Sequence, residues 1–210
     1  MNAASVKLNI AGLAGVMEAL RDEPRAAPPK GTVFVAHPHP LFGGSMDNKV
    51  VQTIARAFVH CGWRSLRFNF RGVGRSAGVY DEGRGECDDL LAAIDECAPT
   101  GALALAGFSF GSFVASSAVE RIHGLRPLSS LVLVGAAVSR FAVAAIPTDL
   151  HPKTLLIHGE ADDTVPLADV LQWARPQSLP VSVVPGAAHF FHGQLHTLRY
   201  LVARHLSPGS

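Results

Sequence analysis

Short apolar runs alternate with longer segments of helical periodicity along most of the chain, and this alternation constrains the fold more than any other feature. The runs expected to form buried strands are 32–36, 65–70, 102–107, 131–135, 154–158 and 181–184. Apolar residues recur at helical spacing between Asp47, a candidate N-cap, and Gly62, and again in segments 86–97, 109–122, 167–174 and 194–206. Strands that alternate with helices in this way predict an α/β fold with a doubly wound, mostly parallel sheet and helices on both of its faces.

The N-terminal segment has a different pattern. Residues 5–10 and 16–20 are separated by a glycine-rich turn at 12–15, and this arrangement predicts an antiparallel hairpin. With the hairpin the sheet has about eight strands. Because 210 residues suit one sizeable domain, we expect residues 1–210 to form a single α/β domain.

Composition and charge exclude several classes of protein. The chain is 48% hydrophobic with a net charge of +1, so it is not disordered, and it lacks the concentrated basic face of a nucleic-acid binder. No apolar run reaches the length of a membrane span, and no clear signal peptide begins the chain. Three cysteines without a C-x-x-C pair do not predict a disulfide framework or a zinc site. We expect a cytoplasmic monomer or homodimer with no nucleic-acid partner and no membrane span.

A nucleophile motif lies between a predicted strand and a predicted helix. Residues 107–111 read G-F-S-F-G, the G-x-S-x-G pattern in which a sharp turn exposes a serine hydroxyl above the sheet. The pattern alone is also that of a glycine-lined turn with a capping serine. Its position after a strand favours Ser109 as a catalytic nucleophile.

A serine hydroxyl needs a histidine to take its proton and a carboxylate to orient that histidine. In sheets with this serine turn, the acid and then the histidine follow later in the chain. Glu160, Asp162 and Asp163 all follow the strand at 154–158, and we favour Asp162 because an aspartate is the more usual orienting group. His189 follows the last strand in a narrow glycine and alanine loop, and is favoured over His192.

Acyl transfer also requires two N–H groups to stabilise the oxyanion. One is expected to be the N–H of Phe110, which follows the nucleophile. The other is expected in the H-P-H-P loop after the strand at 32–36. Because Pro38 and Pro40 have no N–H, the candidates are His39, which we favour, and Leu41.

Two other motifs suggest different chemistry. His37 and His39 form an H-x-H pair, but no further metal ligand follows closely, so no metal is expected. Residues 72–77 fit the loose dinucleotide pattern G-x-G-x-x-A, which must open a helix directly. Further glycines delay the next predicted helix to about Glu86, so we expect a structural loop and no cofactor.

These motifs together resemble the α/β-hydrolase superfamily, in particular its small cap-less serine hydrolases of the predicted esterase or carboxylesterase type. The shared motifs are H-P-H-P-L-F-G-G-S-M-D-N-K at 37–49, F-N-F-R-G-V-G-R-S at 68–76, G-F-S-F-G at 107–111, H-G-E-A-D-D-T-V-P at 158–166 and G-A-A-H-F-F at 186–191. The resemblance implies a catalytic triad of Ser109, Asp162 and His189, with Phe110 and His39 as oxyanion donors. The H-P-H-P loop departs from the commoner H-G-G form.

The resemblance also bears on the shape of the site. Caps in this superfamily usually follow the strand at 131–135, and the 18 residues of 136–153 are too few for a lid domain, so we predict an open site. Phe42, Leu41 and Phe190 are candidates to line an apolar acyl pocket. Phe108 and Phe191, in the same motif loops, either line it as well or pack beneath the serine turn as core.

The sequence therefore predicts a serine hydrolase that cleaves a small-molecule carboxylic ester through an acyl-enzyme on Ser109, with no cofactor. One alternative is a thioesterase, amidase or peptidase with the same triad. The other is a binding protein that keeps the fold without turnover.

Overall fold

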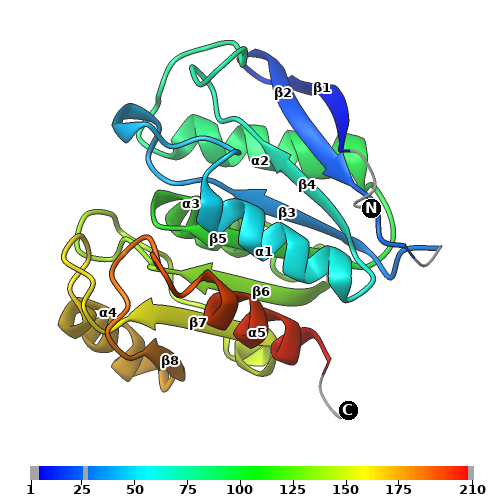
Figure 1. Cartoon of the computed structure of the whole chain (residues 1–210). Helices are drawn as coiled ribbons and strands as arrows, with labels where there is room; N and C mark the ends of the chain where they lie inside the picture. Colours follow the sequence, from blue (N-terminus) through cyan, green and yellow to red (C-terminus); the bar gives the residue numbers. More distant parts are fainter. Residues whose placement is uncertain (1–4, 26–27, 208–210) are drawn as a thin grey trace.

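The computed structural model describes residues 5–25 and 28–207. Segment 23–30, which its three prolines predict to be a loop, lies partly outside the described residues. One eight-stranded sheet has the order β1-β2-β4-β3-β5-β6-β7-β8 (Figure 1). Its strands are β1 (Val6–Gly12), β2 (Gly15–Asp22), β3 (Thr32–Ala36), β4 (Arg64–Phe68), β5 (Leu103–Phe108), β6 (Leu128–Val134), β7 (Thr154–Gly159) and β8 (Val181–Val184). β2 pairs antiparallel with β1 and β4, and all other pairs are parallel. The predicted fold class is confirmed.

Helices cover both faces of the sheet (Figure 1). On one face lie α1 (Lys49–His60) and α5 (Leu195–Leu206), and on the other lie α2 (Arg84–Cys97), α3 (Phe110–Ile122) and α4 (Leu167–Ala174). Three short 3-10 helices complete the elements of the described residues: η1 (Pro40–Phe42), η2 (Thr148–Lys153) and η3 (Arg175–Gln177).

Strand β3 shows why a continuous apolar run forms a central strand here. All five of its residues are buried, and successive side chains enter opposite cores. Val33 and Val35 belong to the core that α1 and α5 cover, whereas Phe34 and Ala36 belong to the core that α2 and α3 cover. A central strand of a parallel sheet is covered on both faces, so its sequence is apolar throughout instead of alternating.

The predicted start of α1 is wrong by one residue. Asn48, not Asp47, is the N-cap: its side chain accepts the N–H of Val50 at 2.9 Å. Asp47 lies outside the helix, with its carboxylate 3.6 Å from Arg67. Both residue types are good caps, and the sequence alone does not show which of two neighbours has the required backbone conformation.

The carboxyl ends of the parallel strands meet at one edge of the sheet. The segments that leave β3, β5, β6, β7 and β8 at this edge contain every residue predicted to act in catalysis. In doubly wound sheets ligands bind at this edge, so it is where the candidate site is built.

Candidate active site

Ser109 occupies the sharp turn between β5 and α3. Its φ of 56° and ψ of −118° are strained for a residue with a side chain, as in a nucleophile turn. The turn requires glycine on both sides: a Cβ on Gly107 would lie 2.2 Å from the Gly111 carbonyl oxygen, and one on Gly111 would lie 2.3 Å from that of Ala36. The Ser109 N–H donates to the Val134 carbonyl at 2.9 Å, which ties the turn to β6.

His189 follows β8 and is held by a carboxylate. Its Nδ1 lies 2.7 Å from Oδ2 of Asp162, and its ring packs against Phe108 and Phe190, with centroids 4.9 and 5.1 Å apart. The residue is 2% exposed, yet it lines the same cavity as Ser109. The Asp162 contact fixes the proton on Nδ1 and leaves Nε2 free to accept one.

Asp162 is fixed by contacts at both of its oxygens. Oδ1 accepts the N–H groups of Thr164 at 3.0 Å and Val165 at 2.8 Å, and Oδ2 also lies 3.4 Å from Nε2 of His158. Burial alone would raise the pKa of Asp162, but the hydrogen bonds from His189 and Val165 and the nearby histidines together lower it. The carboxylate therefore stays ionised against the imidazole.

The alternative residues lie elsewhere. Glu160 and Asp163 are exposed, and they accept hydrogen bonds from the Gly186 N–H and the Thr164 hydroxyl respectively. His192 is also exposed and stacks on Phe190. Of the three carboxylates and two histidines considered from the sequence, Asp162 and His189 are the pair that the fold brings together.

The H-P-H-P loop distinguishes the two candidate oxyanion donors. The Leu41 N–H donates to Nδ1 of His39 at 3.2 Å, so this donor is occupied. Among the described residues, the N–H groups of His39 and Phe110 have no hydrogen-bond acceptor. This pattern favours His39 over Leu41 as the second donor.

The His39 ring is the centre of an aromatic cluster formed by Phe42, Tyr80, Phe110 and Phe141, with centroid separations of 4.8 to 5.8 Å. Because Nδ1 accepts from Leu41, the ring proton is on Nε2, which lies 3.2 Å from the Tyr80 hydroxyl. Burial and then the positive charge of Arg140 lower the pKa of His39, so the neutral ring is favoured. Sequence reasoning missed Tyr80, which comes from a distant loop with no motif to mark it.

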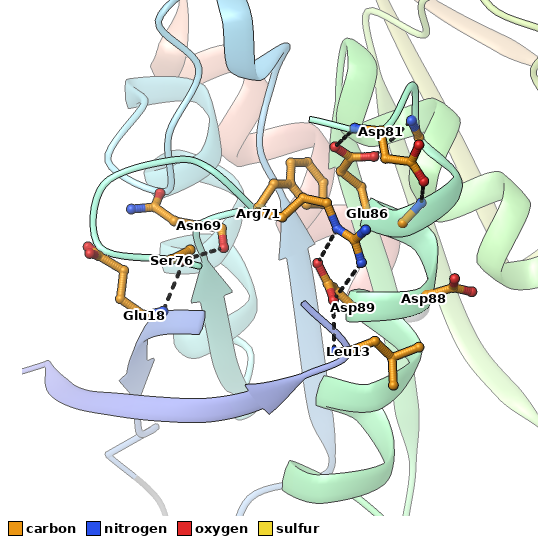
Figure 2. Close-up of polar contacts among 12 residues, drawn as sticks. Leu13, Glu18, Asn69, Arg71, Ser76, Asp81, Glu86, Asp88 and Asp89 are labelled. Atoms are coloured by element: carbon orange, nitrogen blue, oxygen red, sulfur yellow. Dashed lines mark hydrogen bonds and ion pairs between the residues drawn. The ribbon is translucent and has the colours of Figure 1, made fainter. Parts of the chain in front are cut away.

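The loop that carries Tyr80, residues 71–83, is fastened by buried polar contacts (Figure 2). Arg71 pairs with Asp89 through two bonds of 2.8 and 3.0 Å, and Asp89 also accepts the Leu13 N–H at 3.2 Å. Buried Glu86 accepts the N–H groups of Asp81 and Gly83. The dinucleotide-like glycines at 72–77 belong to this loop, and the next helix opens only at residue 84, so they do not present a helix N-terminus to a pyrophosphate.

Breaking the Arg71–Asp89 pair is expected to be costly, because the Asp89 side chain is only 1% exposed. Arg71→Met should lower the free energy of unfolding by about 3–5 kcal/mol, whereas Arg71→Met with Asp89→Leu should cost less. Urea unfolding followed by circular dichroism measures both. Arg84→Gln, which breaks an exposed pair with Asp81, is the control and should have little effect. A double variant no more stable than Arg71→Met would contradict this account.

The ring nitrogens of both His37 and His39 lie within hydrogen-bonding distance of other groups of the chain. Nδ1 of buried His37 lies 2.6 Å from the Pro38 carbonyl, and its Nε2 accepts the Phe70 N–H at 3.0 Å, so His37 fastens the loop to the end of β4. In the described part of the chain, no group of three His, Cys, Asp or Glu side chains is placed to hold a metal ion.

His37 is expected to make stability depend on pH. Burial lowers its pKa from 6.5 to about 4, despite the opposing hydrogen bond to Pro38. Between these values the unfolded chain binds a proton that the folded one excludes, so stability is complete above pH 6.5 and falls toward pH 4, by up to about 3 kcal/mol.

Urea unfolding at several pH values between 8 and 5 measures this dependence. His37→Gln should have a shallower slope of unfolding free energy against pH, although His158 and His205, whose pKa values burial also lowers, keep part of it. An unchanged slope in this variant would show that His37 is not the group responsible.

Ser109 and His189 open into a cavity of about 380 Å³. Its wall is mostly apolar and is lined by Pro38, His39, Phe42, Gly43, Gly44, Asn48, Ser109, Phe110, Ala137, Arg140, Phe141, Thr164, Val165, His189 and Phe190. Leu41, which the sequence also predicts for the pocket, is not among these residues, because neighbouring residues of the 3-10 turn η1 face different directions and Phe42 takes the wall position. Phe108 and Phe191 are fully buried, so they belong to the core.

Comparison with known proteins shows which family this chain belongs to. Residues 27–148 match the model of the hydrolase family described as serine aminopeptidase, S33. An α/β serine hydrolase without a lid from Xanthomonas campestris superposes with a TM-score of 0.87 at 33% identity, covering 100% of this chain and 98% of that one. The chain belongs to the α/β-hydrolase family.

Two further proteins are similar to this chain. An α/β serine hydrolase homologue from Coxiella burnetii superposes on this hydrolase with a TM-score of 0.86 at 35% identity, covering 99% of each chain. A protein of Rickettsia prowazekii (strain Madrid E) is 32% identical over 169 residues, which are 75% of this chain and 71% of that one.

The α/β-hydrolase has no cap among its described residues. Between β6 and β7 the only regular element is η2, which is six residues long. Separately, the described helices include none that is long and apolar enough to cross a membrane. The predicted open site is confirmed, and the cavity wall on this side comes from Ala137, Arg140 and Phe141.

Proposed function

We propose that this hydrolase cleaves carboxylic esters through an acyl-enzyme on Ser109. The Ser109 Oγ attacks the carbonyl carbon while His189 Nε2 takes its proton, and the imidazolium then gives this proton to the departing alcohol. Water attacks the acyl-enzyme as His189 takes its proton, and the acid leaves as that proton returns to Oγ. Asp162 keeps the imidazole in the tautomer that both steps need.

The observation that carries this proposal is the placement of Ser109. Its hydroxyl is on a strained turn, in the same open cavity as a histidine whose other nitrogen is held by a buried carboxylate. Binding alone gives no reason to hold these three groups together. The unoccupied N–H groups of His39 and Phe110 add the donors that a developing oxyanion requires.

A peptidase is the second candidate, because the matching family is described as a serine aminopeptidase. An aminopeptidase must accommodate the positive charge of a free amino terminus, for which a carboxylate in the wall is the natural partner. None of the side chains that line the cavity is acidic, and one is an arginine. This charge pattern favours an ester substrate over an N-terminal peptide.

Labelling with a neutral fluorophosphonate, followed by peptide mapping, tests the proposal. We expect stoichiometric modification of Ser109 in the folded protein and none after denaturation. Folded protein that does not label would favour the non-catalytic alternative. Matched ester, thioester and amide substrates then separate the possible activities, and the ester should have the highest kcat/KM.

A further inference from the structure

One residue with a charged side chain is among those that line the cavity of this hydrolase. Among the lining residues, Arg140 is the only lysine, arginine, aspartate or glutamate. It follows β6 in a turn where the N–H groups of Arg140 and Phe141 both donate to the Ala137 carbonyl at 3.1 Å. The backbone that carries the guanidinium is therefore fixed relative to Phe141 and the His39 cluster.

Arg140 is exposed, and within the described part of the chain it has no partner of its own. No described carboxylate lies within 4.0 Å of its guanidinium, and its side chain makes no hydrogen bond to the described residues. Arg67 and Arg71, in contrast, are buried or nearly so and are paired with Asp22 and Asp89. A free guanidinium beside an apolar wall has its five donors available to a ligand.

The positive charge of Arg140 acts on a histidine that lines the same cavity. After burial, the Arg140 charge is the second cause of the lowered pKa of His39, whose N–H is a candidate oxyanion donor. The same field that disfavours a proton on His39 favours a negative group on a ligand in the cavity. In a concave site with low-dielectric walls, one such charge selects among ligands more strongly than it would on a flat surface.

We propose that the esters hydrolysed at Ser109 carry a negatively charged group, a carboxylate or a phosphate, that pairs with Arg140. This rests on the proposed esterase function and assigns it a substrate class. The guanidinium fork matches both carboxylate and phosphate, so both belong to the same chemistry. Because Ser109 and Arg140 line one cavity, the ester and the anion belong to one small molecule, whose apolar part lies against Phe141 and Phe190.

Matched substrate pairs test this specificity. In the carboxylate series, mono-4-nitrophenyl esters of four- to six-carbon dicarboxylic acids are compared with equally long esters that end in a primary amide. In the phosphate series, butyrate esters of 2-hydroxyethyl phosphate are compared with their neutral dimethyl phosphate triesters. We expect at least one series to show a kcat/KM ratio, anion over neutral, of about 10 to 100. The series with the larger ratio identifies the anion.

Variants at Arg140 should change this ratio specifically. Arg140→Gln should bring it close to one, Arg140→Lys should retain part of it, and Arg140→Glu should invert it and favour an ester that bears a trimethylammonium group. Raising the ionic strength should lower the wild-type ratio. Arg199→Gln removes an exposed arginine of α5 that does not line the cavity, and it should leave both the ratio and the activity unchanged.

The fluorophosphonate separates the two proposals. If wild-type Ser109 does not label, the esterase function itself fails. If Ser109 labels stoichiometrically in the wild type and in Arg140→Gln, but the substrate ratio is the same in both for both series, the esterase function stands and the role of Arg140 is overturned.

Discussion

Replacing Ser109 by alanine is expected to lower kcat/KM for any ester substrate by about 10⁴-fold or more, with the fold intact. In the proposed mechanism this hydroxyl forms the acyl-enzyme, and without it the N–H groups of His39 and Phe110 can only polarise the carbonyl. Rates with a 4-nitrophenyl ester, together with circular dichroism, measure both parts of the result. Residual activity within tenfold of wild type would remove Ser109 from the mechanism.

Ser109→Gly provides the matched control for folding. It removes the same hydroxyl, but glycine adopts a φ of 56° and a ψ of −118° without the strain of a side chain. We expect both variants to be inactive and Ser109→Gly to unfold at higher urea, with a gain of about 1 kcal/mol over Ser109→Ala. Equal stability of the two variants would mean that the turn is not strained.

Asp162→Asn is expected to lower kcat by about 10⁴-fold while the protein stays folded. The asparagine oxygen can keep the Thr164 and Val165 N–H bonds made by Oδ1, which places its NH₂ group where Oδ2 now meets His189. The imidazole then has to accept at Nδ1 and carry its proton on Nε2, so it cannot take the proton of Ser109.

Asp163→Asn is the control for this result, since it changes the neighbouring exposed carboxylate in the same way. We expect near wild-type kcat for Asp163→Asn. The opposite pattern, with Asp163→Asn inactive and Asp162→Asn active, would reassign the acid. The two variants should react with the fluorophosphonate at different rates: Asp162→Asn should react more slowly than Asp163→Asn.

The sheet and the residues at its edge could be predicted because each depends on local sequence. Buried central strands such as β3 are continuous apolar runs, and the nucleophile turn needs glycine at 107 and 111 for reasons that lie within a few residues. Chain order then restricted the acid and the histidine to two short loops. These parts of the prediction required no knowledge of how distant segments meet.

The predictions that were wrong, or that left alternatives open, concern features that depend on contacts between distant segments or on the orientation of a single N–H group or side chain. The backbone angles at the start of α1 decide that Asn48, and not Asp47, is the N-cap. In the same way, the backbone angles of η1 decide that Phe42, and not Leu41, lines the cavity. His39 and Leu41 could be distinguished only after the Leu41 N–H was found on the His39 ring. No sequence motif marks Arg140. It is singled out because no other residue that lines the cavity is a lysine, arginine, aspartate or glutamate.

The short connection between β6 and β7 also has a kinetic consequence. Because no described segment between β6 and β7 forms a cap, we expect a substrate to reach Ser109, and the product to leave, without the opening of a lid. For the proposed esterase we therefore expect acylation or deacylation, and not a closing step, to limit turnover.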